Sequence, residues 1–153
     1  MEPGKRDKRI AEWRRHLRFH ATLYRLQMEQ GMYFLHEHPA GATSWGRGEI
    51  VELMKMEGVQ MTVADQCMYG LRTPSDVKGE SLPAKKPTRF MSNSWCVLQE
   101  LSVRCDRSHA HQRLIGGRAH KAQEYPDGLG RAICRGVANQ KRYDESRRIC
   151  TGR

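Results

Sequence analysis

Long apolar runs and paired cysteines are both missing from this 153-residue chain. No stretch approaches the length of a membrane span, and the basic N-terminal residues are not followed by the apolar core of a signal peptide. The five cysteines are an odd number without a CxxC pair, which argues against a secreted disulfide framework and for a reducing compartment. We therefore expect a soluble intracellular protein without a membrane partner, and the sequence does not distinguish nucleus from cytoplasm.

Aromatic and acidic residues are also scarce. Aromatic side chains make up 7% of the residues and hydrophobic ones 38%, which suits one domain with a modest core. Lys and Arg number 27 against 17 Asp and Glu, and the net charge of +10 predicts DNA or RNA as a partner. Much of the basic excess lies near the two ends, so we expect basic tails over 1–9 and 141–153 around a single domain over 10–140.

The spacing of the remaining apolar residues predicts alternating helices and strands. Apolar residues three or four positions apart predict an amphipathic helix over 10–28. Strands are expected over 33–37, 59–65 and 88–92. Ser44 and Ser94 are the expected N-caps of two further helices.

The order helix, strand, helix, strand is typical of parallel α/β units. Residues 72–87 contain three prolines and little apolar content, which predicts a long loop, and the last third of the chain is expected to be helical. The expected fold is therefore α/β, a partial parallel sheet flanked by helices with a helical C-terminal third.

The segment Met32–Pro39 is typical of a buried strand that ends at a site. Tyr33 and its neighbours have the character of a central strand, and Pro39 prevents further ladder pairing. Ligands bind beyond the ends of parallel strands, so Glu37 and the turn Asp65–Gly70 are expected to share a cleft. The alternative interpretation of Glu37 is a solvated loop carboxylate.

A second candidate site contains Cys105, His109 and His111, a thiol and two imidazoles that suit a borderline-soft ion such as Zn²⁺. Cys96 lies one helix earlier as a fourth ligand, although the spacing matches no standard zinc module. The alternative is that the histidines are structural or contact nucleic acid. A catalytic Cys–His pair has less support, because nothing in the sequence lowers the thiol pKa of Cys105 or Cys67.

Cations surround a rigid bend in the segment 85–89, which can present ammonium and hydroxyl groups to phosphate. With two amide side chains, this segment makes up the predicted nucleic-acid-binding set. Its members are Gln66, Lys85, Lys86, Thr88, Arg89 and Asn93.

Several short motifs, in their order along 10–140, resemble a domain of protist retroelement polyproteins. That domain in turn resembles the later half of the catalytic domain of DNA cytosine-5 methyltransferases. The motifs are Phe34–Pro39, Ser44-Trp45, Asp65–Gly70, Lys86–Phe90, Ser92–Ser94, Cys105 with His109 and His111, and Tyr125-Pro126.

The resemblance implies an incomplete Rossmann-like methyltransferase fold. It implies that Glu37 is the catalytic carboxylate that holds a flipped cytosine, with Gln66 and the basic segment supporting the base. The nucleophile loop and the glycine-rich turn for S-adenosylmethionine are not found in this sequence.

We therefore expect a fragment that is inactive alone and binds no cofactor except a candidate zinc ion. Its partner would be the missing N-terminal half of the domain, and S-adenosylmethionine would bind only in the complete parent. The alternative reading is a noncatalytic nucleic-acid-binding module, stabilised by zinc. A product without selected activity is a third reading.

Overall fold

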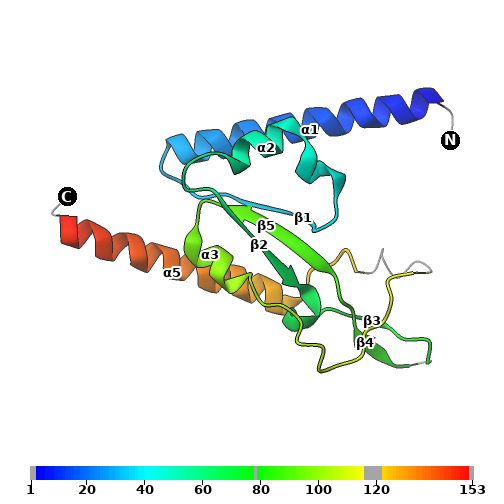
Figure 1. Cartoon of the computed structure of the whole chain (residues 1–153). Helices are drawn as coiled ribbons and strands as arrows, with labels where there is room; N and C mark the ends of the chain where they lie inside the picture. Colours follow the sequence, from blue (N-terminus) through cyan, green and yellow to red (C-terminus); the bar gives the residue numbers. More distant parts are fainter. Residues whose placement is uncertain (1–2, 78, 116–121, 152–153) are drawn as a thin grey trace.

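The computed structural model describes residues 3–77, 79–115 and 122–151. The elements follow the order α1 (Pro3–Glu29), β1 (Leu35–Pro39), η1 (Thr43–Gly46), α2 (Gly48–Met54), β2 (Gln60–Asp65), η2 (Gln66–Tyr69), β3 (Arg72–Pro74), β4 (Ser81–Pro83), β5 (Pro87–Ser92), α3 (Trp95–Glu100) and α5 (Asp127–Thr151). Three layers result: α1 and α2 cover one face of the central sheet, and α3 and α5 cover the other (Figure 1).

The central sheet is antiparallel, so the prediction of a parallel, Rossmann-like sheet is wrong. Its strand order is β1-β5-β2, and β5 runs antiparallel to both neighbours. Phe90 of β5 lies opposite Glu37 on one side and Thr62 on the other. The two early strands do point the same way, as the helix between them suggested, but a strand from later in the chain separates them.

An apolar core forms on each face of the central sheet, because successive side chains of a strand point to opposite faces. Phe90 and Met91 of β5 are both buried, one in each core. The core beneath α1 and α2 contains Leu17, Ala21, Phe34, Trp45, Ile50, Leu53 and Met91. The core beneath α3 and α5 contains Ala64, Tyr69, Phe90, Val97, Leu98, Leu101, Leu129 and Ala132.

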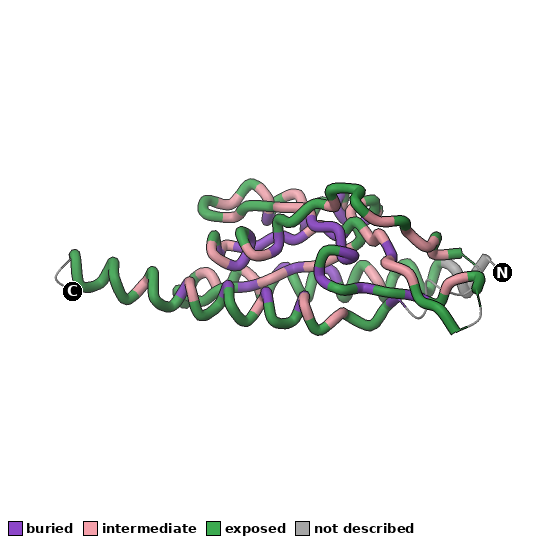
Figure 2. Tube along the Cα trace, turned by 90° about the horizontal axis from the view of Figure 1, so that it is seen from below, coloured by how far each residue is buried: buried purple, intermediate pink, exposed green. Residues whose placement is uncertain are grey.

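Helix α5 approaches its neighbours closely at two glycines. A Cβ atom at Gly136 would lie 2.6 Å from the Cα of Val97 in α3, and one at Gly128 would collide with the Tyr69 carbonyl of η2. The absence of a side chain at these glycines allows the α5 backbone to contact the backbones of α3 and η2. Each glycine lowers helix propensity by about 1 kcal/mol, and the close packing offsets this cost. From Lys141 onward, α5 continues as a largely exposed rod (Figure 2).

Several boundaries differ from those expected. The segment 72–87 contains a hairpin of β3 and β4, whose prolines lie at strand ends, where a missing N–H is tolerated. The described residues at the expected basic tails continue α1 and α5. None of the described helices combines the length and the apolar character needed to cross a membrane.

Candidate metal centre

Two thiols and two imidazoles meet where η2 approaches the segment that follows α3. Cys67 lies in η2, directly after β2, and is buried, whereas Cys105, His109 and His111 lie in the irregular segment after α3. The sequence identified the latter three, but it suggested Cys96 as the fourth ligand. Cys96 is not in the cluster. The fourth donor is Cys67, because η2 lies against the segment that follows α3. The one signal for it in the sequence was its position directly after a predicted strand.

The donor atoms lie close enough together for a tetrahedral site, and the two distances from Cys105 match its edges. The Sγ of Cys105 lies 3.4 Å from Nε2 of His111 and 3.7 Å from Nε2 of His109, and all four donor atoms lie within 4.8 Å of one another. A tetrahedron with Zn–S of about 2.3 Å and Zn–N of about 2.0 Å has edges of roughly 3.3 to 3.8 Å. The cluster can therefore hold a metal ion with small side-chain adjustments.

The backbone around Cys105 is arranged to support a thiolate. The Arg107 N–H donates to the Cys105 Sγ at 3.3 Å, and Arg107 has a φ of 66°, a left-handed conformation that closes the turn. The Asp106 carboxylate accepts from the backbone N–H and the hydroxyl of Ser108, and these bonds lower the pKa of Asp106. This Asx turn brings His109 back toward Cys105.

A buried carboxylate ties the segment to the sheet. Asp65, at the end of β2, accepts the Cys105 backbone N–H at 2.9 Å through Oδ2. The same oxygen lies 3.1 Å from Nε of Arg104 and 3.9 Å from Nζ of Lys85. Asp65 therefore fixes the main chain of one ligand while two cations compensate its charge.

The metal-free thiol and imidazoles differ in their readiness to bind. Burial, followed by the neighbouring Cys105, raises the pKa of Cys67 to about 11, so a metal has to displace its proton. Burial, followed by His109 and Lys85, lowers the pKa of His111, which favours the neutral ring that a metal requires.

The predicted nucleic-acid-binding set is divided between the interior and the surface. Gln66 and Thr88 are fully buried and bond to each other at 2.9 Å. Asn93 bonds to the backbone of Met32 and Phe34, which is a structural role.

The three cations of the set are half-buried, and each has a neighbour. Lys85 lies near Asp65, and Nζ of Lys86 donates to the Ala122 carbonyl at 2.9 Å. The guanidinium of Arg89 lies 5.2 Å from the centre of the Trp45 ring.

Glu37 and the Asp65–Gly70 turn lie at the same end of the sheet but line different cavities. Glu37 faces α5 in a cavity of about 260 Å³ and accepts a hydrogen bond from the Tyr125 hydroxyl. Met68 and Tyr69 line a separate cavity beside α5. Burial, followed by Glu37, raises the pKa of Tyr125, so its hydroxyl remains protonated and can donate. The expected shared cleft is thus replaced, in these parts of the described chain, by two separate cavities.

Four protein donors around one point are typical of a closed, structural metal site rather than a catalytic one, which keeps a coordination position for water or substrate. The chemistry offered by the cluster is thus cross-linking: a metal would join η2 to the segment after α3. In comparisons with protein-family models, curated proteins and solved structures, the chain has no match.

Proposed function

We propose that the chain is a noncatalytic nucleic-acid-binding module, stabilised by Zn²⁺ at Cys67, Cys105, His109 and His111. The observation that carries this proposal is the four-donor cluster within 4.8 Å. Two cysteine and two histidine ligands are a common set for structural zinc. The segment that follows α3 has no regular secondary structure between 102 and 115, so a metal would supply the cross-link that hydrogen-bond ladders supply elsewhere.

Charge around the cluster supports nucleic acid as the partner. Two thiolates neutralise the charge of Zn²⁺, so the nearby cations would still set the sign of the surface potential. Arg107 and Arg113 are exposed on the same segment as the histidine ligands. Further arginines are exposed along α1, including Arg14, Arg15 and Arg18. Such a surface favours phosphate contacts without base reading.

The methyltransferase-like function stays a prediction from the sequence resemblance. Its pocket depended on neighbouring parallel strands, whereas β1 is an edge strand paired with an antiparallel β5. If Glu37 holds a cytosine in a larger assembly, labelled-methyl incorporation will require added partners that supply a nucleophile loop and an S-adenosylmethionine site, and it will be lost in Glu37→Gln.

The metal test uses the full chain purified without added chelator. We expect one equivalent of zinc that depends on the two cysteines and a thermal midpoint that falls on chelation. Replacing the metal with Co²⁺ is expected to give a thiolate-to-cobalt charge-transfer band. Cys105→Ser removes the band and the cysteine-dependent equivalent of zinc, whereas the matched control Cys134→Ser, at an exposed position on α5, keeps both. A protein whose melting is indifferent to chelator and whose Co²⁺ complex lacks the band contradicts the proposal.

The partner test measures binding of a fluorescent oligonucleotide by anisotropy, with DNA and RNA in single- and double-stranded form. Zinc-loaded protein is expected to bind at least about tenfold more tightly than the Cys105→Ser variant, because the cross-link orders the basic segment. Equal affinity for the two proteins would separate nucleic-acid binding from the metal, and an absence of binding at low salt would exclude the nucleic-acid partner.

A further inference from the structure

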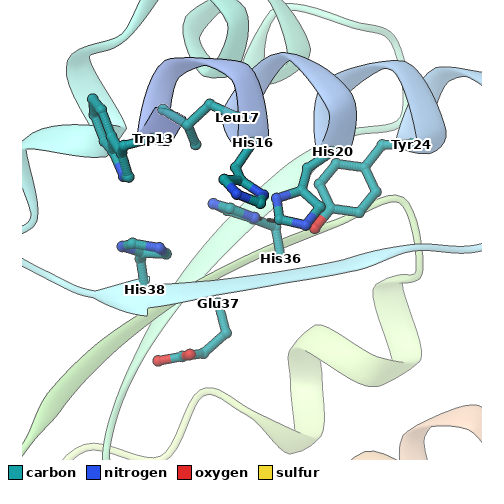
Figure 3. Close-up of a pocket in the computed structure, with 8 residues that line it drawn as sticks. All are labelled: Trp13, His16, Leu17, His20, Tyr24, His36, Glu37 and His38. Carbon is teal, nitrogen blue, oxygen red and sulfur yellow. Dashed lines mark hydrogen bonds between the residues drawn. The ribbon is translucent and has the colours of Figure 1, made fainter. Parts of the chain in front are cut away.

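A second group of imidazoles surrounds a cavity of about 220 Å³ between α1 and β1, on the face of the sheet that α1 covers; Glu37 also lines it, although its carboxylate points away from the histidines. Four of the seven histidines of the chain line this cavity, together with aromatic and apolar side chains (Figure 3). The histidines are His16 and His20 of α1 and His36 and His38 of β1.

The two strand histidines are held in place by hydroxyl groups. His36 and His38 alternate along β1, so both point toward α1 while Glu37 points away (Figure 3). Their rings stack with centroids 5.5 Å apart and an interplanar angle of 12°. The Nδ1 of His36 lies 3.2 Å from the Tyr24 hydroxyl, and the Nδ1 of His38 lies 3.1 Å from the Ser44 hydroxyl.

This arrangement is the one that metal-binding histidines adopt. One ring nitrogen bonds to a neighbouring group, which fixes the tautomer and the ring orientation, and the other nitrogen faces the metal. Here Nδ1 is the atom that contacts a hydroxyl in both rings. A metal would take Nε2, with the Nδ1–H donating to the hydroxyl oxygen.

The Nε2 of His36 is a buried polar atom that has no partner within the described part of the chain. The His36 side chain lies in the wall of the cavity, and the whole residue is 5% exposed. Buried polar atoms are nearly always paired in folded proteins. The unpaired nitrogen therefore indicates a ligand that enters the cavity.

Helix α1 supplies a second pair of donors. His16 and His20 are four positions apart, which places both imidazoles on one face of the helix, the spacing by which helical histidines share a metal ion. Both residues are exposed, so their side chains can rotate at little cost.

That rotation is required for metal binding. The Cys67 cluster is the only compact group of three or more donors among the residues the structure describes, so the histidine group closes on an ion only when the helical rings turn inward.

We propose that this cavity binds a divalent transition-metal ion that prefers imidazole, with His36 and His38 as oriented ligands and His20 and His16 as closing ligands. Imidazole-rich sites suit Zn²⁺, Cu²⁺ and Ni²⁺. The ion would join the outer face of β1 to α1. This proposal does not depend on the cluster at Cys67, since the two groups share no residue and lie on different elements.

The test is a Zn²⁺ titration of metal-free, full-length protein by calorimetry, with ¹⁵N NMR of the imidazole rings. We expect two equivalents for the unmodified chain. In a Cys67→Ser/Cys105→Ser background, one equivalent remains, and its binding shifts the Nε2 resonances of His36 and His38. In that background, His20→Ala is expected to weaken the remaining site at least about tenfold, whereas Arg15→Ala, elsewhere on α1, leaves it unchanged.

Variants at His36 distinguish a ligand from a core residue. His36→Phe keeps an aromatic ring in the wall and removes the unpaired nitrogen, so a folded protein is expected that no longer binds the second equivalent. If the serine background binds no zinc, or binds it equally with and without His20 and His36, the proposal is overturned and the Nε2 of His36 bonds to water. If the histidine site binds zinc and the cysteine cluster does not, the proposed function is contradicted and the present proposal is supported.

Discussion

Asp65 links the sheet to the candidate metal centre through a single carboxylate oxygen. Its side chain is 1% exposed, and it accepts a hydrogen bond from the backbone N–H of Cys105. A carboxylate in this position orients a metal ligand without binding the metal. Arg104 and Lys85 lie beside this oxygen and compensate its charge.

Asp65→Asn is expected to lower zinc affinity by about 10- to 100-fold, the range for groups that orient metal ligands. The amide retains an acceptor but loses the charge that attracts Arg104 and strengthens the bond to the Cys105 N–H. Competition with a chromophoric chelator measures the change, and Asp7→Asn on exposed α1 is the matched control. An unchanged zinc affinity would mean that Asp65 stabilises the fold without orienting a metal ligand.

His36 should make the stability of metal-free protein depend on pH. Burial, followed by the neighbouring His38 and His20, lowers the pKa of His36 to about 4. The unfolded chain takes up a proton near pH 6.5 whereas the folded chain does not, so the free energy of unfolding decreases as the pH falls from about 6.5 to 4. The loss amounts to roughly 3 kcal/mol at most.

Urea unfolding at several pH values, in the presence of chelator, measures this decrease. His36→Phe should flatten the curve over the same interval, and His16→Gln, at an exposed position, should retain it. Parallel curves for the wild type and the phenylalanine variant would show that another group is responsible.

Helix α5 offers a paired test of backbone contact. Gly136→Ala would place Cβ 2.6 Å from the Cα of Val97, so α3 and α5 must separate, at a cost of about 1 to 3 kcal/mol. Gly130→Ala, in the same helix, meets nothing within 4 Å. It should stabilise the protein by up to about 1 kcal/mol through helix propensity. Thermal or chemical denaturation of the two variants gives the signs, and two changes of the same sign would contradict the close approach.

Local patterns predicted the elements better than their arrangement. The apolar spacing in α1 and the N-cap of α3 were visible, and the structure confirms that Ser94 accepts from the Val97 N–H. The position of β5 between β1 and β2 was not visible, because it depends on which strand edges pair and not on any local period. Cys67 was missed as a ligand for the same reason: its partners lie in a segment far along the chain.

At the scale of the whole molecule, positive charge is spread over several elements rather than gathered in one groove. We expect nucleic-acid affinity to fall at least about tenfold between 50 and 200 mM salt, because phosphate contacts release counterions. Arg107→Ala and Arg113→Ala should each reduce the slope of log affinity against log salt by about 1. Lys55→Ala, whose ammonium pairs with Glu52 on α2, is the control. A salt-independent affinity, measured by anisotropy, would exclude the electrostatic account.

The place of β5 in the sheet also sets the order in which the chain can acquire its structure. β1 and β2 both precede β5 in the sequence, and within the described ranges β5 is the one ladder partner of each. During synthesis both strands would therefore wait, unpaired, until residue 92 has left the ribosome, while α1 and α2 can form beforehand from local contacts. The central sheet can therefore form only once residues 87–92 are available to pair with β1 and β2. A nascent chain stalled before them should be protease-sensitive throughout, and one stalled shortly after them should show protection in β1 and β2 together.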